Sequence, residues 1–460
     1  MTIFRCALLM LLSFGATQFL TAADAPPNIV MLISDDQTWT DYSFMGHPDI
    51  KTPHLDKLAA RSAVFRRGYV PVALCRPSLA TMITGLYPHQ HGIIGNDPWK
   101  DSSKSPKQYN DECEQLISKL DKLDTAPELL AQKGYISHQS GKWWEGSFAR
   151  GGFTHGMTRG FPERGGRHGD DGLDIGRKGM KAVTDFIHTA AAEKKPFFMW
   201  YAPFLPHTPH NPPAEILAKY TKEGRPEALA KYYAMCEWFD QTCGQLMDEL
   251  EKEGVADNTV IFYVTDNGWI QRTPDMKLAA GWNSSFAPKS KQSPYDGGTR
   301  TPIMISWPGH IQPADRPELV SSIDLLPTML AAAGIKASEK LPGVNLLPVV
   351  TNETELQRTE IFGESFAHDV ADLDNVQETL LYRWVIQDKW KLLLTYDGKV
   401  NRYKSVHPRT DPRPQLFDLI ADPLEEHNLA KDNPEVVARL AAKLDGWWKV
   451  TERKVVTTFE

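Results

Sequence analysis

The stretch NIVMLISDD, residues Asn28–Asp36, decides the fold class of this chain. Its apolar, β-branched run is typical of a strand that is buried on both faces, and it ends in two aspartates. A second such run, TVIFYVT (Thr259–Thr265), is followed by Asp266 and Asn267. Ligands and catalytic groups of open α/β sheets gather at the carboxyl ends of strands, although Asp-Asp and Asn-Gly pairs also occur in turns and caps. Both strand ends are therefore candidate sites.

The rest of the chain alternates short apolar runs with helical stretches. Strands are predicted at residues 63–65 with 69–70, 135–140, 197–201 and 302–307, and helices at residues 77–85, 175–193 and 225–254. This alternation predicts a wound α/β core with a mainly parallel sheet. After about residue 350 the pattern changes, because residues 380–395 alternate like paired strands and Asn433-Pro434-Glu435 opens a final helix. The sequence therefore predicts a small α+β unit after the core.

Composition and the N-terminus indicate an exported globular protein. The chain has 460 residues, 41% of them hydrophobic, and a formal net charge of −7, which gives no argument for nucleic-acid binding. Arg5 precedes an apolar run over residues 6–19, and small residues follow at 21–23. This pattern predicts a cleaved signal peptide over residues 1–23 and a secreted or periplasmic protein, with a membrane anchor as the alternative. No other stretch approaches membrane-spanning length, so no stable membrane anchor is expected.

Four cysteines follow this leader: Cys75, Cys113, Cys236 and Cys243. Cys236 and Cys243 fall on one apolar stripe of a predicted helix, and their spacing of roughly 10 Å is too long for a disulfide. Cys75 opens the segment CRPSLATMITG, in which Pro77 suits the first helical position. A helix N-terminus favours anions and ionised thiols, so Cys75 is either a nucleophile for an anionic substrate or a buried core cysteine.

The pattern Cys75-x-Pro77-Ser78 with Thr84-Gly85 resembles the maturation motif of the type I sulfatases. These are formylglycine-dependent enzymes of the alkaline phosphatase superfamily. Further segments resemble the same family in the same order, nearly from end to end. They are Ser140–Trp143, Pro206–Pro209, Val264–Gly268, Lys291 with Asp296–Arg300, Asp324–Thr328, and Leu416–Leu419 with Asp422-Pro423 and Asn428-Leu429.

The resemblance implies an α/β fold with an alkaline-phosphatase-like core, in which helices flank a large, mainly parallel mixed sheet. It also implies a small C-terminal α+β subdomain. The sulfatase catalytic domain is accordingly expected over residues 27–370. The subdomain, with a small antiparallel sheet and a terminal helix, is expected over residues 371–460.

The resemblance further implies a metal and a modified residue. A maturation enzyme would convert Cys75 to 3-oxoalanine (formylglycine), whose hydrated aldehyde is the nucleophile. The implied ligands of the cation are Asp35, Asp36, Asp266 and Asn267, together with an oxygen of the modified Cys75. Hard oxygen ligands without a His/Cys cluster fit Ca²⁺ or Mg²⁺ better than Zn²⁺, and Ca²⁺ is the family's ion.

Sulfate ester hydrolysis also needs fixed cations for the anion and an acid for the leaving alcohol. Lys142 and Lys291 are expected to hold the sulfate, with Lys289 as the alternative to Lys291, and His207 is expected to be the acid. The expected catalytic residues are Cys75, Lys142, His207 and Lys291, and the expected substrate contacts are Lys142, His207, Lys291 and Trp144.

Two positions depart from the family pattern, since Leu79 and Trp144 stand where the family carries arginine and histidine. Together they would form an apolar wall able to stack a sugar. Because neither side chain accepts a proton, sulfate release is expected to limit turnover unless His155, His168 or Glu145 supplies a base.

The sequence thus predicts an exported sulfatase acting on sulfate esters of a sulfated carbohydrate with Ca²⁺ assistance. Two alternatives stay open. One is a phosphodiesterase or phosphonate hydrolase of the same superfamily, and the other is a degenerate sulfatase that binds sulfated glycan without turnover.

Overall fold

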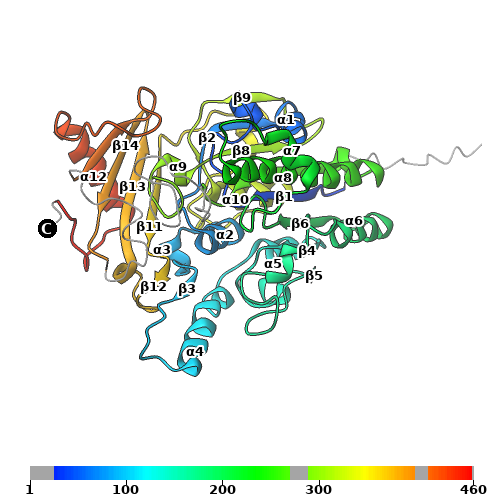
Figure 1. The fold of residues 1–460 in the computed structure, drawn as a ribbon, viewed down its shortest axis with the longest axis horizontal. Coiled ribbons are helices and arrows are strands. Elements are labelled where there is room, and N and C mark those ends of the chain that lie inside the picture. The colour runs from blue at the N-terminus through cyan, green and yellow to red at the C-terminus, as the bar shows by residue number, and fades with distance from the viewer. Residues whose placement is uncertain (1–24, 270–288, 399–412, 458–460) are drawn as a thin grey trace, which may run out of the picture.

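A large mixed sheet forms the centre of the molecule in the computed structural model, which describes residues 25–269, 289–398 and 413–457 (Figure 1). β1 (Asn28–Ser34) pairs in parallel with β6 (Phe197–Ala202) on one side and β7 (Thr259–Thr265) on the other. β4 (Ile136–Gly141) runs parallel to β6, whereas β8 (Arg300–Ser306) runs antiparallel to β7. The predicted mainly parallel mixed sheet is confirmed.

The full strand order is β10-β2-β8-β7-β1-β6-β4-β5, with β9 beside β2. The other strands of this sheet are β2 (Ala63–Tyr69), β5 (His155–Gly156), β9 (Ala314–Arg316) and β10 (Val320–Ser321). The helices are α1 (Pro53–Ala59), α2 (Cys75–Thr84), α3 (Pro88–His91), α4 (Pro106–Ile117), α5 (Ala126–Ala131), α6 (Lys181–Glu193), α7 (Ala214–Tyr220), α8 (Glu227–Lys252), α9 (Asp296–Thr299), α10 (Leu325–Ala332), α11 (Leu347–Val350) and α12 (Pro434–Trp447).

β1 contributes to two hydrophobic cores because successive side chains of a strand point to opposite faces of the sheet. Ile29, Met31 and Ile33 belong to the core that includes side chains of α2, α5 and α10. Val30 and Leu32 belong to the core on α1, α6 and α8. Since helices cover both faces, the strand is apolar throughout rather than alternating, as its sequence predicts.

The C-terminal subdomain, orange to red in Figure 1, is built on a second, antiparallel sheet. Its strands are β11 (Glu360–Phe366), β13 (Leu380–Gln387), β14 (Trp390–Thr395) and β15 (Gln415–Asp418). One face of this sheet packs against α12 and the other against side chains of the core. A further short strand, β12 (Asp369–Val370), pairs with β3 (Asp97–Pro98) of the core. The boundary expected at residue 370 stays a prediction.

Three helix starts differ from the sequence-based prediction, one of them being that of α8, which begins at Glu227 rather than at residue 225. α2 begins at Cys75 rather than at Pro77, because the first N–H groups of a helix have no partner within it and a proline in the first turn loses no hydrogen bond. α6 begins at Lys181 rather than near residue 175, because Gly176 and Gly179 adopt positive φ angles of 75° and 124°.

All four cysteines after the leader are free and buried. The predicted signal peptide at residues 1–23 lies outside the described residues. Among those that are described, none of the helices combines the length and the apolar character that a membrane crossing requires.

A buried ion triad joins the subdomain to the core. Lys391 of β14 lies 2.8 Å from Asp296 Oδ1 and 3.0 Å from Glu425 Oε1, and all three side chains are at most 1% exposed. By contrast, Lys443 of α12 pairs with Glu360 at 2.9 Å where both side chains remain partly exposed.

We predict that Lys391→Met lowers the free energy of unfolding by about 3–5 kcal/mol, because two buried carboxylates lose their counter-charge. The matched substitution Lys443→Met, at a solvent-screened pair, is expected to cost less than about 1 kcal/mol. Denaturant unfolding of the two variants beside the parent protein measures the difference. Equal losses would contradict the triad's role.

Candidate active site

The carboxyl ends of β1 and β7 bring acidic side chains together. The register aligns Ser34 of β1 with Thr265 of β7, so the residues that follow, Asp35 and Asp266, emerge at the same edge of the sheet. The backbone N–H of Asp36 donates to Asp266 Oδ1 at 3.2 Å, which ties the two strand ends to each other.

Asn267 completes this group. Its Nδ2 donates to Asp36 Oδ1 at 2.7 Å. Asp36 itself has a φ of 60°, in the left-handed region that aspartate tolerates better than most residues. Asp35, Asp36, Asp266 and Asn267 are each at most 2% exposed. We call these four residues the acidic cluster.

Two buried lysines neutralise part of the acidic cluster. Lys142, just beyond the end of β4, donates to Asp35 Oδ1 at 2.5 Å and to Asp266 Oδ2 at 3.1 Å. Lys291 donates to Asp36 Oδ1 at 2.5 Å. Each ammonium group is thus held by carboxylates in a place where neither partner is exposed to water.

Burial and these contacts together set the protonation of the cluster. Burial raises the pKa of Asp266 to about 7 and also raises that of Asp35, since Lys142 offsets it only in part. At Asp36 the effect of burial is outweighed by Lys291 and the other nearby positive groups, which hold its pKa below the usual range. Burial opposes charge on both lysines as well, but the carboxylates outweigh it and raise their pKa values.

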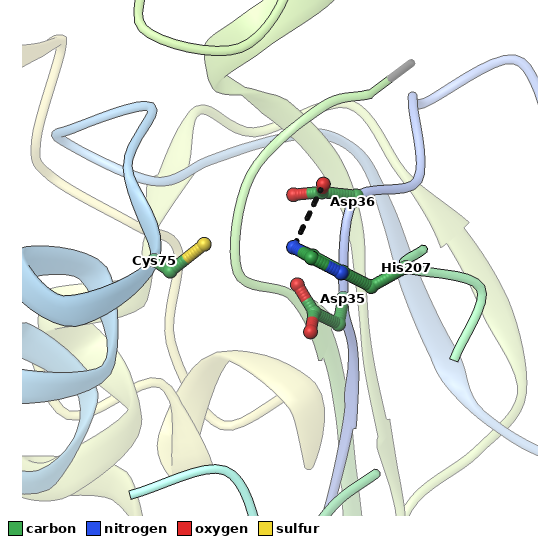
Figure 2. A group of neighbouring side chains, drawn as sticks. All are labelled: Asp35, Asp36, Cys75 and His207. Carbon is green, nitrogen blue, oxygen red and sulfur yellow. Dashed lines mark ion pairs between the residues drawn. The ribbon is translucent and has the colours of Figure 1, made fainter. Parts of the chain in front are cut away.

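Cys75 and His207 face the acidic cluster from different elements (Figure 2). One ligand atom from each of Asp35, Asp36, Cys75 and His207 lies within 4.8 Å of the others. Cys75 is the first residue of α2 and is 2% exposed. Burial raises the pKa of its thiol to about 12, although Lys142 and Lys291 lower it. The unmodified thiol is therefore neutral at pH 7 and a weak nucleophile.

His207 lies in the loop after β6. Its Nδ1 donates to the carbonyl oxygen of Thr208 at 2.8 Å, and its Nε2 lies 3.5 Å from Asp36 Oδ2. Burial lowers the pKa of His207 to about 4, although Asp36 raises it. Since a carbonyl oxygen only accepts, the contact with Thr208 places a proton on Nδ1, and Nε2 is the ring nitrogen that faces Asp36.

Arg177 fixes the loop that carries His207. Its guanidinium donates to the carbonyl oxygens of Phe204, His207 and Pro209 at 2.5, 2.8 and 3.0 Å. The guanidinium carbon, Arg177 Cζ, lies 5.7 Å from the centre of the Trp238 ring. Sequence reasoning missed this residue, because contacts with backbone carbonyls leave no pattern in the partner's sequence.

A cavity of about 160 Å³ lies over these groups, and we call it the reaction cavity. It brings together all the residues predicted as catalytic or substrate-binding. Its lining residues are Cys75, Asn96, Lys142, Trp144, Arg167, His168, Phe204, His207, Lys291 and His368. Lys289, the alternative to Lys291, instead donates to the carbonyl oxygen of Glu425.

Four lining residues were not predicted: Asn96, Arg167, Phe204 and His368. Arg167 lies in the Gly-rich connection over residues 150–172, whose length and composition indicate an active-site loop or an insertion. His368 has no such signal. Its Nδ1 lies 2.5 Å from Asp369 Oδ1, and Asn96 Nδ2 lies 3.3 Å from its Nε2. If Asp369 accepts from Nδ1, Nε2 is left as an acceptor toward Asn96.

The two residues that differ from the family pattern, Leu79 and Trp144, occupy different environments. Trp144 lines the reaction cavity, with its ring 5.3 Å from Lys142 Nζ. Leu79 is buried in α2 and belongs to the hydrophobic core, so the expected wall consists of Trp144 without a contribution from Leu79 to the cavity lining.

Of the three residues proposed as replacement bases, His168 reaches the reaction cavity. Glu145 is occupied by a buried, two-bond ion pair with Arg76 at 2.7 Å. His155 lies on β5 at the sheet edge and is exposed. Burial lowers the pKa of His168 to about 3, so the ring stays neutral.

The acidic cluster fits a divalent cation with hard oxygen ligands. Asp35 Oδ2, Asp36 Oδ2 and Asn267 Oδ1 are buried and have no hydrogen-bond partner among the described residues. Buried polar atoms normally have partners, so three such oxygens in one cluster indicate a site for a bound ion. Three carboxylates also exceed the two ammonium groups in charge, and oxygen ligands suit Ca²⁺ or Mg²⁺.

Comparison with known proteins gives consistent matches along the chain. Residues 27–335 match the family model described as Sulfatase, and residues 289–449 match the one described as N-sulphoglucosamine sulphohydrolase, C-terminal. Arylsulfatase A of Bos taurus is 29% identical over 465 residues, covering 90% of this chain and 85% of that protein. N-acetylgalactosamine-6-sulfatase of Mus musculus is 28% identical over 392 residues, covering 76% of this chain and 71% of that protein.

Solved structures share the fold. The crystal structure of Ps i-CgsB in complex with k-i-k-neocarrahexaose matches with a TM-score of 0.69 and 24% identity, covering 93% of this chain and 94% of that one. The phosphonate monoester hydrolase of Agrobacterium radiobacter matches with a TM-score of 0.66 and 18% identity, covering 91% of this chain and 95% of that one.

We predict that Ca²⁺ stabilises the metal-stripped protein through the acidic cluster. At a hundredfold excess over its Kd the ion should add about 2.7 kcal/mol to the free energy of unfolding, seen as a rise in Tm. Asp36→Asn should abolish this increment.

The control is Asp41→Asn. Asp41 is also buried, but it accepts from Tyr232 Oη at 2.7 Å and lies outside the acidic cluster. This variant should lose stability and keep the calcium increment. An increment that survives in Asp36→Asn, or that Zn²⁺ produces more strongly than Ca²⁺, would contradict the assignment.

Proposed function

The chain belongs to the sulfatase family of sulfuric ester hydrolases, and we propose that it is an exported enzyme that removes sulfate from a sulfated carbohydrate. The observation that carries the proposal is the reaction cavity, in which two buried lysines, the acidic cluster, Cys75 and His207 converge. The carbohydrate is supported by the names of relatives, one of which is an N-acetylgalactosamine-6-sulfatase, and by the aromatic side chains Trp144 and Phe204 in the cavity lining.

The metal site proposed here is the acidic cluster. Asp35, Asp36, Asp266 and Asn267 would hold Ca²⁺, whose charge would neutralise oxygens of the sulfate group. The unpaired oxygens of three of these residues support the choice. Lys142 and Lys291 balance part of the carboxylate charge, and a divalent cation would balance the rest.

Cys75 is proposed to act after a maturation enzyme has converted it to 3-oxoalanine (formylglycine). The hydrated aldehyde of the modified residue would supply the nucleophilic oxygen. The high pKa of the thiol supports this, because a buried neutral thiol attacks poorly. The position at the start of α2 also suits an anionic substrate, since the helix terminus carries partial positive charge.

Binding and proton transfer fall to the other lining residues. Lys142 and Lys291 would hold the non-bridging oxygens of the sulfate through their fixed ammonium groups. His207 Nε2 would donate a proton to the leaving sugar oxygen. The ring is neutral before substrate binds, and the negative sulfate favours its protonated form once bound.

A second imidazole would serve the step that needs a base. His368 lines the same cavity, and Asp369 lies 2.5 Å from its Nδ1, so the carboxylate orients the ring. We assign His368 Nε2, rather than the weakly basic His168, as the proton acceptor that compensates for Trp144.

Sulfate release from a set of sulfated mono- and oligosaccharides tests the function. The same preparation is assayed on nitrophenyl sulfate, a nitrophenyl phosphodiester and a nitrophenyl phosphonate, and the peptide that contains Cys75 is analysed by mass spectrometry. Sulfate ester turnover should exceed the two phosphorus reactions, and Cys75→Ala should abolish it. Faster phosphonate or phosphodiester turnover would assign the protein to the related hydrolases, and binding without turnover by fully converted protein would make it a glycan-binding relative.

We predict that His207→Ala lowers kcat on a sugar sulfate by about 100-fold or more, because a sugar alkoxide leaves only with a proton. Nitrophenyl sulfate has a good leaving group and should lose less than about tenfold. His210→Ala, in the same loop but outside the lining of the reaction cavity, is the control and should affect both substrates alike. Equal losses in His207→Ala would argue against its acid role.

A further inference from the structure

A second cavity, of about 250 Å³, lies beside the reaction cavity. The two share Trp144 and Arg167 as lining residues. We call the second cavity the side pocket. Its remaining wall includes Lys100, Tyr109 of α4 and Phe161 of the Gly-rich connection. A ligand that fills the reaction cavity and continues past Trp144 and Arg167 would enter the side pocket.

Aromatic side chains from three separate segments line the side pocket: Tyr109, Trp144 and Phe161. Such rings offer flat apolar faces of the kind that pack against the C–H faces of a sugar. Trp144 is 7% exposed, and its Nε1 has no hydrogen-bond partner among the described residues. An indole N–H only donates, and Trp144 lines both cavities.

A buried ion pair holds the Trp144 wall in place. Arg76 and Glu145 form two bonds of 2.7 Å, and their side chains are each 4% exposed. Glu145 follows Trp144 directly, and Arg76 follows Cys75 and itself lines the side pocket. The ion pair therefore joins the helix that carries Cys75 to the segment that carries Trp144.

The side pocket carries one positive charge in excess, because Arg76 is balanced by Glu145 and Arg167 by Asp97 while Lys100 remains. Arg167 is compensated, since its Nη2 lies 2.6 Å from Asp97 Oδ2 while its side chain remains 47% exposed. Lys100 is exposed, and its Nζ lies 5.4 Å from the centre of the Tyr109 ring. In the described part of the chain Lys100 pairs with no carboxylate, so an acidic group on a ligand can approach it.

We propose that the side pocket binds the sugar next to the sulfated one, and that an acidic substituent on this second sugar meets Lys100. The inference rests on the proposed function and adds the substrate class: a sulfated oligosaccharide with a neighbouring acidic sugar rather than a single sulfated sugar. Trp144 then has a positive role at the junction, where it contacts both sugars of the substrate.

The probes are sulfated hexosamines, each free, linked to a uronic acid, or linked to glucose. Steady-state kinetics with the parent protein should give the highest kcat/KM for the uronic acid disaccharide. Tyr109→Ala should lower kcat/KM for both disaccharides by about 3- to 10-fold. Lys100→Gln should lower it by roughly 2- to 5-fold for the uronic acid disaccharide and leave the glucose disaccharide unchanged.

Lys107→Gln, on the exposed face of α4, is the matched charge control and should change neither disaccharide. None of these variants should alter turnover of nitrophenyl sulfate. Binding of the same probes to Cys75→Ala protein, measured by calorimetry, separates the two proposals. If no probe is turned over yet the disaccharide binds more tightly than the monosaccharide and Tyr109→Ala removes the difference, the side pocket stands and the enzymatic proposal fails.

The inference is overturned if mono- and disaccharides bind the Cys75→Ala protein equally. It is also overturned if Tyr109→Ala lowers kcat/KM for the free sulfated hexosamine as much as for the disaccharides. A loss in Lys100→Gln that is the same for uronic acid and glucose disaccharides removes the acidic substituent from the proposal.

Discussion

Charge balance inside the protein is the constraint on which this site depends. Three carboxylates at the ends of β1 and β7 are almost completely buried, and ions in such a place are costly unless they are paired. Lys142 and Lys291 provide the pairing, each with a bond of 2.5 Å to an aspartate. Any substrate anion must enter a cavity where the positive and negative groups already hold each other in position, so little reorganisation is needed when it binds.

The sheet edge explains how residues far apart in the chain meet. Parallel pairing of β1 with β6 and β7 sends three loops from the same edge, and these loops carry the acidic cluster and His207. α2 approaches from the side and adds Cys75 (Figure 2). The acidic cluster and Cys75 therefore stand at the ends of regular elements, whereas the Gly-rich connection supplies Arg167 and His168 to the cavity lining.

Sequence reasoning predicted the parts that have a local cause. β1 and β7 were predicted with the observed bounds, because an uninterrupted apolar run followed by Asp-Asp or Asp-Asn is visible within nine residues. It could not predict His368, whose contact with Asn96 joins positions 272 residues apart. Arg177 escaped notice for another reason, since it binds carbonyl oxygens that every residue has. The start of α6 was wrong by six residues because glycines that break a helix also occur inside apparent periodic patterns.

The two-residue ladder between β3 and β12 has a consequence for how such enzymes can diversify. It fastens the C-terminal subdomain to the core beside the reaction cavity, and His368 immediately precedes it. The core thus supplies the acidic cluster and Cys75, while the subdomain supplies His368 to the lining of the same cavity. Exchange of the subdomain between related proteins would then replace one wall of the cavity, while the acidic cluster and Cys75 stay in place.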